Sequence, residues 1–144
     1  MLLDSNPGND AVEKVALFES VIKGETFAFF DVEDFELIIE YYLELDFKKK
    51  AKKALEIALE QYPIDLALIL IKIEFLNSSQ RFDESLNALN NLNKFHPNNI
   101  DVVLGLGRLY SLMENEPHAI KYLNHAHDLI SVSYTHLRAH ETER

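Results

Sequence analysis

The sequence predicts an all-α chain built from helical hairpins that recur every 34 residues. Three observations lead to this prediction. Residues of matching type return at steps of 34 along the chain. Within each step, apolar residues recur at the three- and four-residue spacing of an amphipathic helix. Residues that favour helix ends separate the steps. We therefore expect three helix–turn–helix repeats preceded by one N-terminal helix.

The first expected helix covers AVEKVALFESVIK, behind the capping candidates Asn9 and Asp10. Its apolar residues follow helical spacing, and Gly24 marks its end. The next stretch, GETFAFFD, contains Phe27, Phe29 and Phe30. We expect an irregular or extended connector whose rings cover the first repeat. A β-strand is the alternative, although the sequence shows no partner strand. The N-terminal helix and the connector together span residues 1–30.

From residue 31 onward, six rows of residues align at intervals of 34. They are helix caps, helix-stopping prolines, apolar residues and small residues. The rows are Asp31, Asp65 and Asn99; Pro63 and Pro97; Phe35, Ile69 and Val103; Tyr42, Leu76 and Tyr110; Leu55, Leu89 and Leu123; and Ala51, Ser85 and Ala119. The row of small residues has a physical reason, because short side chains let neighbouring helices approach closely.

These rows place six helices in three hairpins. We expect them at about 32–45 with 48–61, 65–78 with 82–95, and 100–113 with 117–130. Pro117 suits the first turn of the last helix, where its missing N–H costs no hydrogen bond. Helices of roughly 14 residues are marginal alone. Stacking must therefore stabilise them, with about 1.5–3 kcal/mol from each buried Leu, Ile or Phe side chain.

The pattern resembles the tetratricopeptide repeat family, whose 34-residue unit follows W-x2-L-G-x2-Y…A-x3-F…P. The third repeat carries Leu106, Gly107, Tyr110, Ala119, Leu123 and Ala126. The first carries Ile38, Tyr42, Ala51, Leu55, Ala58 and Pro63. The second keeps Phe82 and Pro97. It departs from the consensus at three positions, where Lys72 replaces the usual Leu, Ser85 the usual Ala and Leu92 the second Ala. Ile39 and Ile73 replace a small residue, a departure that bears on how closely those two hairpins pack.

The resemblance covers residues 32–131, in repeats of about 32–65, 66–99 and 100–131. It implies a right-handed α–α superhelix whose concave groove is lined by the first helix of each repeat. The implied lining positions are Glu33, Glu36, Glu40 and Glu44, then Ala67, Leu70, Glu74 and Asn77, then Asp101, Leu104, Arg108 and Ser111. Family members that grip a chaperone's C-terminal carboxylate use Lys and Asn at such positions. This chain has Glu36 and Glu40 there, so that function is not carried over.

The function that we expect is a scaffold that binds a peptide or partner protein in this groove. The groove is acidic at one end and more apolar at the other, which favours a basic or amphipathic partner. Simple solvation of these carboxylates is the alternative. Residues 1–47 hold 12 acidic and 2 basic residues and so carry the whole net charge of −10. Such a chain repels nucleic-acid phosphates, and no apolar run approaches the ~20 residues of a membrane span. The sequence leaves the oligomeric state open.

No catalytic residue, cofactor or metal site is expected. The sequence has no G-x-S-x-G, P-loop or H-E-x-x-H motif, and it has no cysteine. His118, His125 and His127 lie on the last helix, but a zinc site needs convergent ligands, so surface histidines are favoured. The lysines within residues 48–53 resemble a nuclear localisation signal. We favour a solvated face that partly neutralises the acidic region. The absence of cysteine and of a secretory signal fits the cytoplasm.

The tail, residues 131–144, departs from the repeat. Ser133 and Leu137 would suit a next repeat, but His140, Glu141 and Arg144 stand where Leu, a small residue and Tyr are expected. The string SYTHLRAHETER resembles translated sequencing-adaptor readthrough. We hypothesise that native sequence ends near Ser131, that residues 132–144 are non-native, and that the parent protein is longer. In that case the chain is an accessory repeat segment, its activity is encoded beyond residue 131, and the last helix exposes an apolar face.

Overall fold

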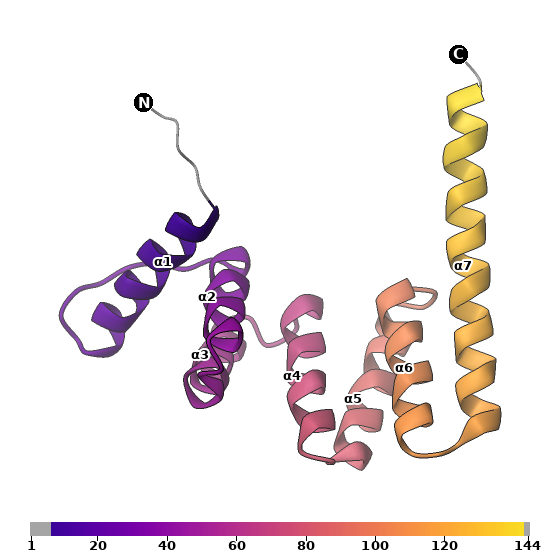
Figure 1. Ribbon diagram of the computed structural model, residues 1–144, viewed down its shortest axis with the longest axis horizontal. Helices are drawn as coiled ribbons and strands as arrows, with labels where there is room; N and C mark the ends of the chain where they lie inside the picture. The colour runs from indigo at the N-terminus through magenta and orange to yellow at the C-terminus, as the bar shows by residue number, and fades with distance from the viewer. Residues whose placement is uncertain (1–6, 143–144) are drawn as a thin grey trace. The chain divides into compact units, whose positions relative to one another are not determined.

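The computed structural model describes residues 7–142, and every regular element in that range is an α-helix (Figure 1). The helices are α1 (Pro7–Ile22), α2 (Val32–Glu44), α3 (Lys48–Gln61), α4 (Leu66–Ser78), α5 (Phe82–Phe95), α6 (Ile100–Leu112) and α7 (Glu116–Thr142). The all-α prediction is confirmed for this part of the chain. Two compact units divide between Lys72 and Ile73, within α4.

The helix bounds confirm the 34-residue helical repeat. Helices α2, α4 and α6 have 13 residues each and begin 34 residues apart. Helices α3 and α5 have 14 residues each and are also 34 apart. All the predicted hairpin helices lie within one residue of their observed bounds, except that α7 continues through the tail to Thr142. Arg144 lies outside the described residues.

The predicted start of the N-terminal helix is wrong. Helix α1 begins at Pro7, so Asn9 and Asp10 lie inside its first turn and not before it. The reason is that proline has no N–H to leave unpaired and a φ already suited to a helix, which makes it a favourable first residue.

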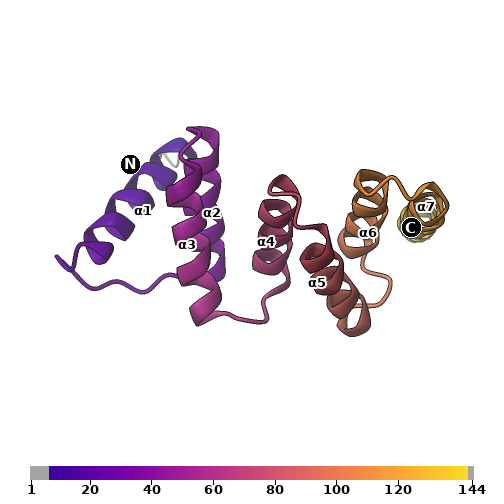
Figure 2. The same ribbon diagram turned by 90° about the horizontal axis from the view of Figure 1, so that it is seen from below.

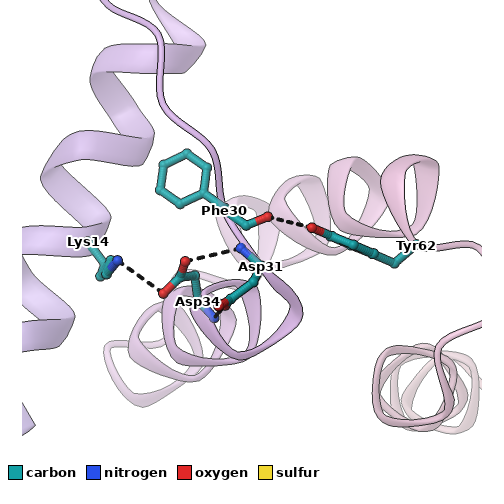
Figure 3. A network of polar contacts seen from close by, with 5 residues as sticks. All are labelled: Lys14, Phe30, Asp31, Asp34 and Tyr62. Carbon is teal, nitrogen blue, oxygen red and sulfur yellow. Dashed lines mark hydrogen bonds and ion pairs between the residues drawn. The ribbon is translucent and has the colours of Figure 1, made fainter.

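Each repeat begins at a side-chain cap, as the sequence predicts. The Asp31 carboxylate accepts a hydrogen bond from the Asp34 N–H at 2.8 Å, and Asp34 accepts one from the Asp31 N–H at 3.1 Å (Figure 3). Asp65 and Asn99 each accept a bond from the backbone N–H three residues later, at 3.0 and 3.2 Å. These bonds satisfy N–H groups that a helix leaves unpaired at its start.

The turn inside each hairpin also repeats. One residue with positive φ follows the first helix of each repeat: Asp46 at 63°, Gln80 at 59° and Glu114 at 60°. The N–H of the next residue then donates to the carbonyl five residues earlier, which belongs to Tyr42, Leu76 or Tyr110, at 2.8–2.9 Å. This six-to-one hydrogen bond is the Schellman arrangement that ends a helix. Tyr42, Leu76 and Tyr110 therefore occupy equivalent places in successive hairpins.

An aromatic cluster forms the core of the N-terminal unit. Phe35 is fully buried, and the rings of Phe18, Phe30 and Tyr62 surround it with centroids 5.7–6.3 Å away. The Tyr62 hydroxyl donates to the Phe30 carbonyl at 2.9 Å (Figure 3). The expectation that all three connector rings cover the repeat is wrong for Phe27 and Phe29, which are 99% and 80% exposed.

Close helix contacts shape the C-terminal unit. A Cβ added at Gly107 would lie 2.7 Å from Leu123 Cδ2, so this glycine lets α7 approach α6. Ile39 and Ile73 stand at the equivalent positions and are fully buried, so those hairpins accommodate a large side chain. Leu123 itself is 39% exposed, unlike the other two leucines of its row.

The small-residue row is buried, including the polar Ser85. The Ser85 hydroxyl donates to Asn77 Oδ1 at 2.6 Å, which satisfies both groups. None of the helices in the described part of the chain is long and apolar enough to cross a membrane.

Candidate functional site

Four glutamates form one row along α2 in the N-terminal unit. Glu33, Glu36, Glu40 and Glu44 follow at three- and four-residue steps, which place them on one helix face. Glu36 is half-buried and the others are exposed. Burial raises the pKa of the Glu36 carboxyl, and repulsion from Asp65, Glu33 and Glu40 raises it further. The row therefore holds negative charge that a nearby cation would stabilise.

A cleft of about 450 Å³ lies between α4 and α6 in the C-terminal unit. Its lining residues are Glu74, Asn77, Ser78, Arg108, Ser111 and Leu112. Glu74 and Arg108 occupy the same position in successive repeats, and the Arg108 Nη2 to Glu74 Oε1 distance is 3.1 Å. Both side chains are more than 60% exposed, and such pairs contribute little to stability. Their charged groups can therefore rearrange toward a ligand at small cost.

Asn77 has a fixed orientation in this cleft. Its Oδ1 accepts the hydrogen bond from the buried Ser85 hydroxyl at 2.6 Å. The amide nitrogen of Asn77 therefore remains a donor, and it belongs to a residue that lines the cleft. The cleft thus combines an amide donor, a guanidinium, a carboxylate and hydroxyls with the apolar side chain of Leu112.

The structure brings together part of the expected groove. Glu74, Asn77, Arg108 and Ser111 meet around the cleft, whereas Asp101 and Leu104 lie on α6 outside its lining. Sequence reasoning missed Ser78 and Leu112. They stand 34 and 68 residues after Glu44, which is itself an expected lining residue, so the 34-residue period could have identified both. The glutamate row and Leu70 belong to the N-terminal unit.

A second cleft, of about 270 Å³, lies within the N-terminal unit. It is lined by Phe18, Glu19, Ile22, Lys23, Tyr42, Lys50 and Lys53. Glu19 accepts a hydrogen bond from the Tyr42 hydroxyl at 2.9 Å and lies 3.3 Å from Lys50 Nζ. The Tyr42 bond, with help from Lys50, lowers the pKa of Glu19, while burial and Glu19 raise that of Tyr42. Lys48 Nζ also lies 4.0 Å from the Asp46 carboxylate, so two lysines of the basic cluster pair with the acidic N-terminal region.

His118, His125 and His127 of α7 have separate partners. His118 stacks on the Tyr110 ring with centroids 4.8 Å apart, and His125 Nε2 lies 3.0 Å from Asn98 Oδ1. His127 lies 4.0 Å from the neighbouring Asp128 carboxylate. Among the residues that the structure describes, no three His, Cys, Asp or Glu side chains converge as metal ligands would.

The α4–α6 cleft thus brings together groups of several chemical kinds: a carboxylate, an amide, a guanidinium, hydroxyls and an aliphatic side chain. It is built from equivalent positions of two successive helical repeats. Its polar groups suit recognition of another polypeptide, because they can pair with both backbone and charged side chains. No protein-family model, curated protein or solved structure matches this chain.

Proposed function

We propose that this chain is a tetratricopeptide-type repeat protein that binds an extended peptide or partner-protein segment in a right-handed superhelical groove. The α4–α6 cleft carries the proposal. An extended peptide presents carbonyl and N–H groups that need partners when they leave water. The Asn77 amide N–H and the Arg108 guanidinium would donate hydrogen bonds to peptide carbonyls. The Glu74 carboxylate would accept a hydrogen bond from a peptide N–H or pair with a basic side chain, and Leu112 would contact an apolar side chain.

The charge of the α2 row supports a basic or amphipathic partner. Glu36 already feels repulsion from the carboxylates beside it, and a bound Lys or Arg would relieve this repulsion. The proposed activity is binding without catalysis. Charge complementarity of this kind contributes to specificity and to the association rate more than to affinity alone.

A peptide ligand can be obtained by selecting a random 12-residue phage-displayed library on the whole chain. Replacing the exposed Ser111 with Trp should then weaken binding of the selected peptides at least about tenfold, because the indole fills the cleft. Isothermal titration calorimetry measures the affinity. The matched control is Ser131→Trp, an exposed serine of α7 that does not line the cleft. Equal affinities for the wild-type chain and Ser111→Trp would contradict the assignment.

The acidic row is tested by the double substitution Glu36→Lys and Glu40→Lys. We expect at least about tenfold weaker binding of basic peptides and a smaller dependence of affinity on salt. Binding to the unmodified chain should weaken as the pH falls through the raised pKa of Glu36, because protonation removes the charge that a cation contacts.

Glu56→Lys with Glu60→Lys is the matched control for this charge reversal. Both residues are exposed and lie on α3, away from the α2 row. Each double variant replaces two glutamates with two lysines, so the net charge of the chain changes by the same amount. If the control weakens binding as much as the α2 variant does, general charge and not the row explains the effect. If the α2 variant binds basic peptides with the same affinity and the same salt dependence as the wild-type chain, the α2 row is not part of the binding site.

A further inference from the structure

The connector between α1 and α2 exposes two aromatic rings. Phe27 is 99% exposed and Phe29 is 80% exposed, whereas Phe30 is 3% exposed. Phenylalanine is among the residues most often buried, and each ring removes a large apolar area from water when it is covered. Two neighbouring phenylalanines in solvent therefore need an explanation beyond the packing of this unit.

The exposure of residues 27–30 alternates as in a β-strand. Phe27 and Phe29 face solvent, while Ala28 is half-buried and Phe30 is buried. This period of two is that of extended backbone, whose successive side chains point to opposite sides. Figure 2 shows the connector as a drawn-out stretch between α1 and α2, with no helical turn.

Both ends of this stretch are held in place. Gly24 turns the chain with a φ of 77°, and the Glu25 N–H donates to the Ser20 carbonyl at 2.9 Å. At the other end, the Phe30 ring packs in the aromatic cluster, and the Phe30 carbonyl accepts a hydrogen bond from the Tyr62 hydroxyl (Figure 3). The stretch is thus positioned before any partner arrives, which lowers the entropy cost of binding.

Apart from the Phe30 carbonyl, the backbone of the stretch is open to pairing. No described residue accepts a hydrogen bond from the N–H groups of residues 26–30. An extended segment with unpaired backbone groups is a template on which another chain can add a strand. A pairing of only two strands is marginal in water, and the two exposed rings supply the additional apolar contact that it needs.

The charges around the stretch select the partner. Glu25 and Asp31 flank it, within an N-terminal region of 12 acidic and 2 basic residues. Antiparallel pairing with a second copy about Ala28 would place Glu25 opposite Asp31 of that copy, and like charges directly opposite are destabilising. A strand flanked by lysine or arginine would instead find opposite charges at both ends.

We propose that residues 26–30 form a docking strand for a partner polypeptide. The partner segment is extended, carries apolar side chains at alternate residues, and has Lys or Arg at its ends. It adds to the connector by backbone hydrogen bonds and covers the Phe27 and Phe29 rings. This surface is distinct from the proposed repeat groove, and neither proposal depends on the other.

The test is a random nine-residue peptide library selected in parallel on the wild-type chain and on the variant Phe27→Ser with Phe29→Ser. Peptides enriched only on the wild type should show the alternating apolar pattern with basic ends. They should bind the double variant at least about tenfold more weakly. In the complex, amide hydrogen exchange of residues 26–30, measured by NMR, should slow relative to that of the free chain.

Phe95→Ser is the matched control, because Phe95 on α5 is also 80% exposed. It should retain full affinity for these peptides, and so should Ser111→Trp, which acts on the repeat groove. The proposal is overturned if both selections enrich the same peptides or none, if the wild-type-specific peptides lack the pattern, or if exchange of residues 26–30 is unchanged. Sedimentation that shows a dimer lost in the double variant would also overturn it, because the occupant would then be a second copy.

Discussion

Replacing Phe35 with alanine is expected to lower the free energy of unfolding of the N-terminal unit by about 3–5 kcal/mol. The side chain is fully buried, and the rings of Phe18, Phe30 and Tyr62 surround it at centroid distances of 6.1, 5.7 and 6.3 Å. These rings come from α1, the connector, and the residue that follows α3. Truncation would therefore leave a cavity that a change in one element cannot close.

Urea denaturation followed by circular dichroism measures this loss. Because a repeat protein can unfold in parts, amide exchange should be followed in α2 and α3 as well. Phe29→Ala is the control, since it removes the same side chain from an 80% exposed site. It should change stability by no more than about 0.5 kcal/mol. Similar losses in the two variants would mean that the Phe35 ring is not at the centre of this core.

The second large effect is expected at Leu89 of α5. Leu89→Ala should lower the free energy of unfolding of the C-terminal unit by about 2–5 kcal/mol. Leu89 is fully buried, and its Cδ2 lies only 2.9 Å from where a Cβ at Gly105 would stand, so the side chain packs against the α6 backbone. Removing it separates α5 from the helix that it covers.

Amide exchange in α5 and α6 is the direct readout for this variant, together with urea denaturation. Exchange in both helices should accelerate, because local opening needs less free energy once the contact is lost. Leu112→Ala, at a site 52% exposed on α6, is the control and should have a small effect on stability. A Leu89 variant with unchanged exchange in α6 would show that α5 and α6 are not coupled through this residue.

The repeat could be predicted from the sequence because its causes are local. A cap at Asp31, Asp65 or Asn99 pairs with N–H groups within three residues, whatever packs on the helix. The apolar period decides which face each helix buries. Four of the twelve expected lining residues, Glu74, Asn77, Arg108 and Ser111, meet in the cleft, because positions 34 residues apart in the sequence lie on neighbouring helices of successive repeats.

Other features became visible only in the structure. Asp46, Gln80 and Glu114 adopt positive φ without being glycine; their cause is local, since the six-to-one hydrogen bond offsets the strain, but the residue types gave no sign of it. Ser78 and Leu112 hold the repeat position of Glu44, and the structure shows that they line the same cleft at the ends of α4 and α6. The three connector phenylalanines look alike in sequence, yet only Phe30 finds a cluster of rings to join.

The amino-acid sequence by itself determined the repeat helices, their starting residues to within one position and their 34-residue period, since each follows from contacts within a few residues of the chain. Only the tertiary structure decided which apolar and polar groups are covered and which stay in solvent. It placed Phe35 at the centre of a core and left Phe27 and Phe29 outside. The physical reason is that burial depends on atoms brought from distant parts of the chain, and residue type alone does not say whether such atoms arrive.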